Sequence, residues 1–426
     1  VVSDRLEMLA DALAARLAQS PSADLLAGPT IVVPSRGMER WLTMRLASRF
    51  GIWASSPLPF PETWLRALAS ACGVATTEPD RWTRDTVECA LYDILQDTSD
   101  ADLRAWFGEN ADDRRTLVFA RQLAECYDQY AVYRPELLLA WEAGQPAPDP
   151  RVPALEAAWQ ARLWRALVAR LGPDHPARMW MRLRDVLAQR PLPPGSPLPV
   201  HVFGVTALPP IHVEILAALG RISDVTVWAF NPCREMWFEA PSRSSAMLGE
   251  PEAEDHALDA VPSLLALNGR LGRDFLTAIY EAAQWQVREL WSDPSHDPPG
   301  ALGTVRRRIV DGLPDVRTQG PRVPWPEHDA SPSISLHVCH SPRREVEVLR
   351  DRLLHLFDRH PDLSPRDVLV MAPDIELYAS HIAAVFGAED PPLPHAIADR
   401  SPLLIGHLAE AIRRMLRLPD GEATAP

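Results

Sequence analysis

The sequence predicts an α/β protein whose parallel sheet is interrupted by an inserted all-α domain. Three observations support this prediction. Short apolar, β-branched runs at residues 30–34, 200–205 and 225–230 end in turns, and helical patterns follow them. Residues 76–195 show helical spacing with no strand pattern between the helices. A hydrophobic content of 46% with 23% charged residues is typical of a globular protein.

The run at residues 30–34 is predicted to be a buried parallel strand, and a helix is expected from residue 38 to about residue 50. Ser35, Arg36 and Gly37 lie between the two. Ligands of open α/β sheets bind beyond the carboxyl ends of strands, and helix N-termini attract phosphate. These three residues are therefore predicted to meet a ligand.

A second α/β unit is predicted near the end of the chain. Strands are expected at 334–339 and 367–372, with helices at 343–358 and 375–386, the first of them capped by Ser341. The stretch before this unit is rich in Pro, Asp and Arg, which indicates a linker. The predicted domains are residues 1–75 with 196–285, the insertion 76–195, the linker 286–333, and the second unit 334–426.

Two absences exclude a working ATPase in this chain. All 43 residues counted as Lys or Arg are Arg, whereas a phosphate-binding P-loop needs a Lys. The predicted strand at 200–205 runs into Thr206-Ala207-Leu208 and offers no acid to hold Mg²⁺. We therefore expect no cofactor, metal ion or catalytic residue in this chain.

Composition also bears on location and partners. The five cysteines form no CxxC pair, which favours reduced thiols in the cytoplasm. The sequence shows no run of apolar residues long enough to span a bilayer. A net charge of −14 argues against a non-specific basic coat for nucleic acid, although a local arginine-lined channel is compatible with it.

Arginines and aromatic residues are interleaved in two groups. The first group comprises Arg36, Arg40, Trp41, Trp53, Phe60, Trp64 and Arg66, and the second comprises Tyr127, Asp128, Gln129, Tyr130, Tyr133 and Arg134. Such interleaving suits single-stranded DNA, with guanidinium groups on phosphates and rings stacked on bases. The alternative is that the rings pack in the core and the arginines keep the surface soluble. The pattern alone leaves both interpretations open.

Several motifs, in order along nearly the whole chain, resemble the RecC family, the γ subunit of exodeoxyribonuclease V. They are Ile31-Val32-Val33-Pro34-Ser35-Arg36-Gly37-Met38-Glu39-Arg40-Trp41-Leu42, Tyr127-Asp128-Gln129-Tyr130, Phe203-Gly204, Ala207-Leu208-Pro209-Pro210, Asn231-Pro232-Cys233-Arg234, Gly269-Arg270-Leu271-Gly272-Arg273-Asp274 and His337-Val338-Cys339-His340-Ser341-Pro342. Each motif alone is modest, but their combination is specific.

The resemblance implies a superfamily-1 helicase-like, P-loop NTPase-like fold that has lost its ATPase motifs, followed by the start of a second helicase-like domain. It implies RecB and RecD as partner subunits that use ATP and Mg²⁺. It also implies a role in double-strand break repair by homologous recombination: splitting duplex DNA, guiding single strands and scanning the 3′-ended strand for the Chi sequence. RecC chains are longer, so this sequence is expected to correspond to their N-terminal part.

The family's Chi-scanning face maps onto several positions of this chain. Asp128, Gln129, Arg134 and Arg178 match the family pattern. Departures from it occur at Pro34, Arg36, Arg40 and Arg66, where the family has polar amides, a hydroxyl and an aromatic residue. Because arginine favours guanine or phosphate over adenine, the resemblance implies a different octamer or none.

Two other functions stay open at this stage. An AddB-like helicase–nuclease subunit would carry iron–sulfur cysteines and nuclease acids further along the chain. A structural scaffold for RecB would contact the partner without reading bases.

Overall fold

The computed structural model describes residues 1–19, 30–53, 58–74, 81–97, 112–149, 154–189, 192, 199–237, 263–283, 285–313, 333–388, 391–398, 411 and 415. The chain divides into two compact units, Val1–His328 and Asp329–Pro426. The first unit contains a sheet and most of the helices, and the second is described below on its own.

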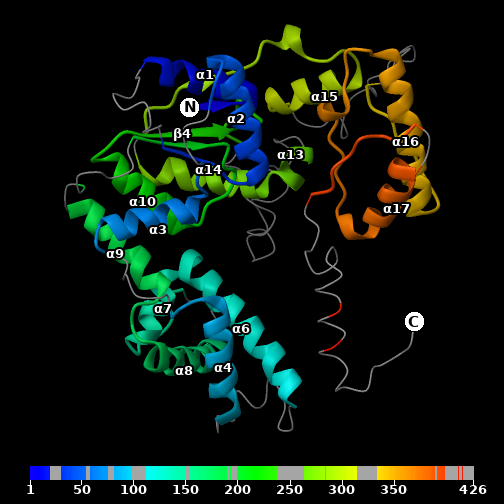
Figure 1. The fold of residues 1–426 in the computed structure, drawn as a ribbon. Helices are drawn as coiled ribbons and strands as arrows, with labels where there is room; N and C mark the ends of the chain where they lie inside the picture. Colours follow the sequence, from blue (N-terminus) through cyan, green and yellow to red (C-terminus); the bar gives the residue numbers. More distant parts are fainter. Residues whose placement is uncertain are drawn as a thin grey trace. The chain divides into compact units, whose positions relative to one another are not determined.

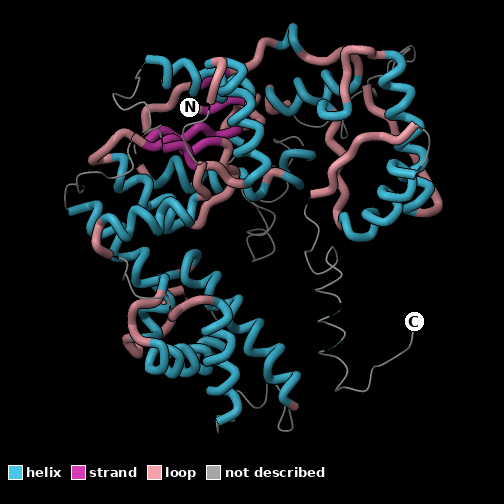
Figure 2. Tube along the Cα trace, viewed as in Figure 1, coloured by secondary structure: helices cyan, strands magenta, loops and turns pink. Residues whose placement is uncertain are grey.

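A five-stranded parallel sheet in the order β2-β3-β4-β1-β5 forms the centre of the first unit (Figures 1 and 2). The strands are β1 Val2–Ser3, β2 Thr30–Val32, β3 Val200–Phe203, β4 Val225–Phe230 and β5 Glu289–Leu290. Thr30 lies opposite Val200, which lies opposite Val225, and Val2 lies between Ala229 and Glu289. The predicted α/β class and its parallel sheet are confirmed. Strands β1 and β5 were missed, because two residues are too short for an alternation to show.

Helices cover both faces of the sheet (Figure 1). Those of the first unit are α1 Leu6–Gln19, α2 Arg36–Phe50, α3 Pro61–Ala71, α4 Arg84–Asp97, α6 Asp113–Tyr133, α7 Pro135–Glu142, α8 Ala154–Leu171, α9 Pro176–Gln189, α10 Pro210–Gly220, α13 Ser263–Asn268, α14 Arg270–Ala282 and α15 Ala301–Val310. A 3₁₀ turn spans Pro294–His296.

Alternation along the strands assigns side chains to two hydrophobic cores. Ile31 and Trp228 point to the face covered by α1 and α2, where they pack with Leu9 and Leu42. Their neighbours in sequence point to the opposite face, toward α3, α9, α10 and α14; Val32 and Val227 are examples. Because successive residues of a strand face opposite sides, a strand buried on both sides must be apolar throughout. This explains why the apolar residues in the runs 200–205 and 225–230 are largely consecutive and do not alternate with polar ones.

A third core lies in the helical region that the sequence predicts as an insertion. Buried side chains of α4, α6, α7 and α8 form it, Trp141, Trp159 and Trp164 among them. Within the described part of 76–195, every regular element is a helix. Helix α9 joins the regions, since Ala177 packs in this core whereas Trp180 packs against the sheet. The domain boundaries at 75/76 and 195/196 stay predictions.

The beginning of the predicted linker 286–333 has regular structure instead. It supplies β5 and α15, and residues 314–332 lie outside the described part. Asp4, at the end of β1, is 7% exposed and accepts hydrogen bonds from Ser292 N–H at 2.9 Å and Ser292 Oγ at 2.5 Å. Arg306 of α15 pairs with both Asp4 and Asp297. Buried charge pairing, which composition cannot reveal, thus fixes this polar segment to the sheet.

Gly303 in α15 allows a close approach that a larger residue would prevent. A Cβ atom there would overlap the carbonyl oxygen of Pro298. We expect Gly303→Ala to destabilise the full-length protein by about 1–3 kcal/mol, since backbone must shift to make room. Gly272→Ala is the matched control, because its Cβ would meet only Trp237 at 4.0 Å. Equal unfolding midpoints for the two variants would contradict this interpretation.

The second unit contains α16 Pro342–Arg359, a 3₁₀ turn at Pro365–Asp367 and α17 Ile375–Ala388. Its core is built from Val346, Val385, Phe386 and Leu393. The predicted cap is confirmed, because Ser341 Oγ accepts a hydrogen bond from the Arg344 N–H at 3.3 Å.

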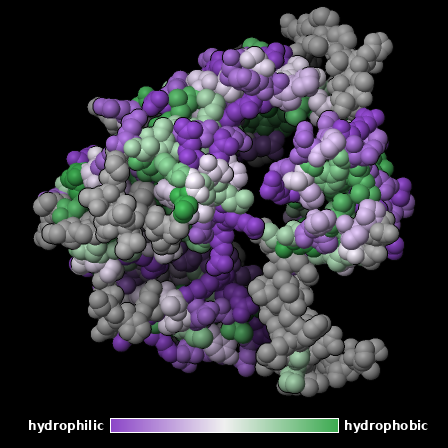
Figure 3. All heavy atoms as spheres, turned by 45° about the horizontal axis from the view of Figure 1, so that its top comes forward, coloured by the Kyte–Doolittle hydropathy of each residue, from purple (hydrophilic) through white to green (hydrophobic). Residues whose placement is uncertain are grey.

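The strands predicted at 334–339 and 367–372 are wrong for the described structure, which assigns no strand to either segment. Leu336 and Val338 are 89% and 91% exposed, and Leu369 and Met371 are 82% and 83% exposed. Hydrophobic side chains of this unit reach the surface at the right of Figure 3. A strand needs a neighbour to pair its backbone groups, and none of the described residues supplies one. The apolar residues of these two segments indicated a preference for strand conformation. The sequence could not show whether another strand would pair with them.

Candidate nucleic-acid interface

The N-terminus of α2 presents four of the predicted residues at the carboxyl end of β2. Ser35 is the N-cap, and its Oγ accepts a hydrogen bond from the Met38 N–H at 3.2 Å. Arg36, Gly37 and Arg40 are exposed beside it. Because the first N–H groups of a helix lack helical partners and lie at the positive end of its dipole, this end can attract an anion.

Two contacts fix this helix end against neighbouring elements. The Val33 N–H donates to the carbonyl of Pro59 at 3.0 Å, so the start of α3 lies beside the end of β2. Gly204, after β3, has φ +66°, and a Cβ there would be 3.1 Å from the Met38 Cε atom. The turn after β3 thus packs closely under α2, which explains the glycine at this position.

Three aromatic residues predicted to contact DNA pack within the fold. Trp41 stacks on Phe203 with ring centroids 6.3 Å apart. Phe60 packs, half-buried, in the same core. Trp64 is 3% exposed, so its ring has no face open to a base. For these residues the structure favours the core-packing interpretation that the sequence left open.

The side chain of Arg66 lies where helices α3, α6, α9 and α10 meet, which we call the helix junction. Its guanidinium lies 5.6 Å from the centroid of the buried Trp180 ring, and its Nε donates to Glu62 at 2.9 Å. Asp128 of α6 is close enough for Glu62 and Arg66 to act on its charge. Burial first, and then the Glu62 carboxylate, raise the pKa of Asp128. The structure therefore brings two predicted residues, Arg66 and Asp128, together.

The other residues predicted in the helical region differ in whether their side chains are free to contact DNA or form ion pairs within the protein. Gln129 and Arg134 are exposed on α6 and at its C-terminal cap. Arg178 instead donates to Glu142 at 2.5 Å, and Glu142 also contacts the fully buried His175 at 3.0 Å. The Arg178 guanidinium therefore ties α9 to α7, a role that its match to a family pattern did not suggest.

Sequence reasoning missed two members of the helix junction, Glu62 and His212. His212 is 4% exposed, and burial lowers the pKa of its imidazole to about 4. Only one local signal was available, the Pro210 helix start that places His212 in the first turn of α10.

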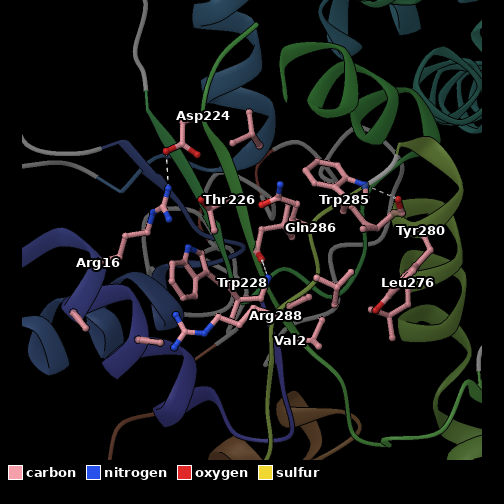
Figure 4. A pocket seen from close by; sticks show the side chains of 18 of the residues that line it. Val2, Arg16, Asp224, Thr226, Trp228, Leu276, Tyr280, Trp285, Gln286 and Arg288 are labelled. Atoms are coloured by element: carbon pink, nitrogen blue, oxygen red, sulfur yellow. Dashed lines mark hydrogen bonds and ion pairs between the residues drawn. The ribbon is translucent and has the colours of Figure 1, made fainter. Parts of the chain in front are cut away.

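A pocket of about 560 Å³ opens at the opposite end of the strands from α2, beside the amino ends of β1 and β4 (Figure 4). An ion pair between Arg16 and Asp224 at 2.6 Å borders it, and the Trp285 indole donates to the Ile279 carbonyl at 2.8 Å. None of the predicted site residues line this pocket. Ligands of parallel α/β sheets bind at the carboxyl edge, so we place the candidate interface at α2 and the helix junction.

No cluster of three metal-ligating side chains occurs among the described residues. Within the same residues, no helix has the length and hydrophobicity needed to cross a bilayer. A groove of about 490 Å³ in the second unit is lined by α16 and residues 335–339. It contains none of the predicted site residues.

A parallel α/β fold with exposed guanidinium groups at a helix N-terminus and a charged helix junction is typical of a protein that recognises a polar, anionic ligand. Comparison with known proteins defines the family. Residues 1–311 match the family "RecC, N-terminal domain", and the chain belongs to the RecC family.

Relatives named RecBCD enzyme subunit RecC match along nearly the whole chain. The proteins of Escherichia coli K12 and Mycolicibacterium smegmatis are each 32% identical, over 92% and 99% of the chain. The Haemophilus influenzae protein is 27% identical over 99% of it. The chain spans 38%, 39% and 42% of the lengths of these three relatives.

Proposed function

We propose that this chain is the N-terminal part of a non-catalytic RecC subunit that guides DNA within a RecBCD-type complex. The observation that carries the proposal is its match, over 92% to 99% of its length, to relatives named as RecBCD subunits. The partners would be RecB and RecD, which would use the ATP and Mg²⁺. The complex would act in double-strand break repair by homologous recombination, in the cytoplasm at the nucleoid.

The fold supports a helicase-like origin for the first unit. Strand β1 lies inside the sheet between β4 and β5, so the loop from β1 into α1 occupies a switch point where such sheets bind ligands. That loop carries Asp4, which is buried and paired with Arg306, in a chain without lysine. Internal pairing at the site where a P-loop would hold phosphate agrees with a frame that has lost its ATPase.

The two parts of the interface differ in charge, and we infer different DNA contacts for them. The α2 N-terminus with Arg36 and Arg40 offers positive charge, which suits phosphate. Around Asp128 in the helix junction, the groups that act on its charge are Glu62 and Glu125 against Arg66 and Arg84, so three carboxylates including Asp128 face two guanidiniums. Excess negative charge repels phosphate, whereas carboxylates accept hydrogen bonds from base amino groups. The junction would therefore contact bases.

Salt dependence tests this assignment in the reconstituted complex of full-length subunits. Arg36→Gln with Arg40→Gln should weaken single-stranded DNA binding similarly for all sequences. The slope of log K against log salt should become shallower, by about 0.7 per lost phosphate contact, through counterion release. Asp128→Asn is the matched control and should leave that slope unchanged. An unchanged slope in the double arginine variant would reject the phosphate role of α2.

Chi reading is the finer part of the proposal. Because Arg66 of the helix junction replaces a neutral group of the family pattern, we infer that a different octamer is read, or none. Chi-dependent switching of the complex should therefore be absent on the usual octamer. Normal switching on the usual octamer would contradict this inference but would not affect the assignment to the RecC family.

A scaffold without base reading is the second candidate function. It is favoured by the 3% exposure of Trp64, by the stacking of Trp41 on Phe203 and by the Arg178–Glu142 ion pair, because each gives a predicted DNA contact a role within the fold. Photocrosslinking of single-stranded DNA at Arg40 and Arg134 separates the two candidates, because a scaffold would give no crosslink. Membership of the RecC family removes the reason to retain the AddB-like alternative.

A further inference from the structure

His212 is a buried polar side chain whose ring nitrogens have no hydrogen-bond partner. It lies in the first turn of α10, is 4% exposed, and neither Nδ1 nor Nε2 is paired within the described part of the chain. Leaving buried polar atoms unpaired is costly, and in native proteins such groups often have a functional reason. A Phe or Leu would fill the same space without this cost.

The indole ring of Trp180 lies close to both the buried His212 and the Arg66 side chain. The His212 imidazole packs edge-on against Trp180, with centroids 4.9 Å apart and planes at 75°. The Arg66 guanidinium lies 5.6 Å from the centroid of the same indole, and Glu62 accepts from its Nε at 2.9 Å. Trp180 is 0% exposed, so it cannot reach a ligand itself. Through Trp180, the position of His212 affects Arg66.

Charge adds a second connection between the two side chains. Glu62 and Arg66 are the charged groups that act on the His212 imidazole. A neutral imidazole has one nitrogen lone pair, which can attract a guanidinium without adding negative charge to a junction that already holds three carboxylates. Phenylalanine would preserve the packing on Trp180 but not this attraction.

We propose that His212 is a positioning residue that fixes Arg66 over Trp180, so that Arg66 and Asp128 meet a nucleobase edge in one geometry. The proposal rests on the proposed function, in which the helix junction contacts bases of single-stranded DNA. Base discrimination depends on such fixed geometry, because a wrong base leaves donors and acceptors unpaired. Phosphate contacts at α2 do not depend on it.

The test uses the reconstituted complex of full-length subunits and single-stranded oligonucleotides that differ at one base. His212→Phe should reduce the preference among these oligonucleotides about five- to tenfold, the size of one lost base contact. Its salt slope should equal that of the wild type. His212→Gln, which restores a polar acceptor, should recover most of the preference. Arg36→Gln is the matched control and should change the salt slope while keeping the preference.

The outcomes separate this inference from the proposed function. A wild-type complex that shows no base preference overturns both. If the wild type has a preference, then a uniform loss of affinity in His212→Phe, or no change, overturns the positioning role alone. If His212→Gln does not recover the base preference, the shape of the side chain matters and not its ring nitrogen. That result would also overturn the positioning role. Unfolding midpoints of the variants should match the wild type, so that any loss of preference is not a loss of fold.

Discussion

Asp4→Ala is expected to lower the free energy of unfolding of the first unit by about 2–4 kcal/mol, because it removes one of the two carboxylates that pair with Arg306 and leaves its buried neighbours short of a hydrogen-bond acceptor. The Asp4 side chain is 1% exposed and that of its partner Arg306 is 23% exposed. The change also removes the acceptor of two hydrogen bonds from Ser292. Strands β1 and β5 and helix α15 would lose the contact that joins them.

Hydrogen exchange of the full-length protein can locate this effect. Amides of β1, β5 and α15 should exchange faster in the variant, whereas those of the helical core around Trp141 should not change. Asp224→Ala is the matched control, because its ion pair with Arg16 is exposed, at 57% and 45% for the two side chains. That pair should contribute less than about 1 kcal/mol. Similar losses for both variants would contradict the structural role assigned to Asp4.

Acidification is the second change with a large expected effect. Burial lowers the pKa of both His201 and His212 from 6.5 to about 4. The unfolded chain therefore binds protons at these two residues at a higher pH than the folded chain does. Their contribution to stability is complete above pH 6.5 and is lost as the pH falls from 6.5 to 4. Each histidine should account for about 3 kcal/mol of that loss.

The measurement compares the wild type with His212→Phe between pH 7.5 and pH 4. Exchange of the α9 and α10 amides, corrected for intrinsic rates, reports the local free energy of opening. At pH 7.5 the variant should be at least as stable as the wild type, since phenylalanine leaves no polar atom unpaired. Below pH 6.5 its stability should fall less steeply, by about 1.4 kcal/mol per pH unit. Parallel profiles would mean that His212 is not held neutral by burial.

Short strands and exposed segments show where sequence reasoning reached its limit. The strands at 225–230 and 200–203 were predictable because burial on both faces makes them predominantly apolar. The two-residue strands β1 and β5 exist only because longer neighbours pair with them. The runs at 334–339 and 367–372 have the composition of strands but no partner among the described residues. Pairing is a property of two segments, so one segment's composition cannot decide it.

The candidate interface shows the same division. The strand–turn–helix pattern was sufficient to place Ser35, Arg36 and Gly37 at a helix N-terminus, because capping and the strand end are local features. The solvent accessibility of a side chain, by contrast, does not follow from its local sequence. Trp64 and Arg66 are two residues apart on α3, yet one is buried and the other lies in the helix junction.

By itself, the sequence determined the α/β class, the helical region, the absence of lysine chemistry and membership of the RecC family, because each depends on composition or on short motifs. Only the tertiary structure decided which polar groups remain available. Arg178 forms an ion pair with Glu142, and Asp4 forms another with Arg306. His212 packs against Trp180 and has no hydrogen-bond partner among the described residues. Helices α3, α6, α9 and α10 are far apart in the chain, and only their packing brings these charges and rings within reach of one another.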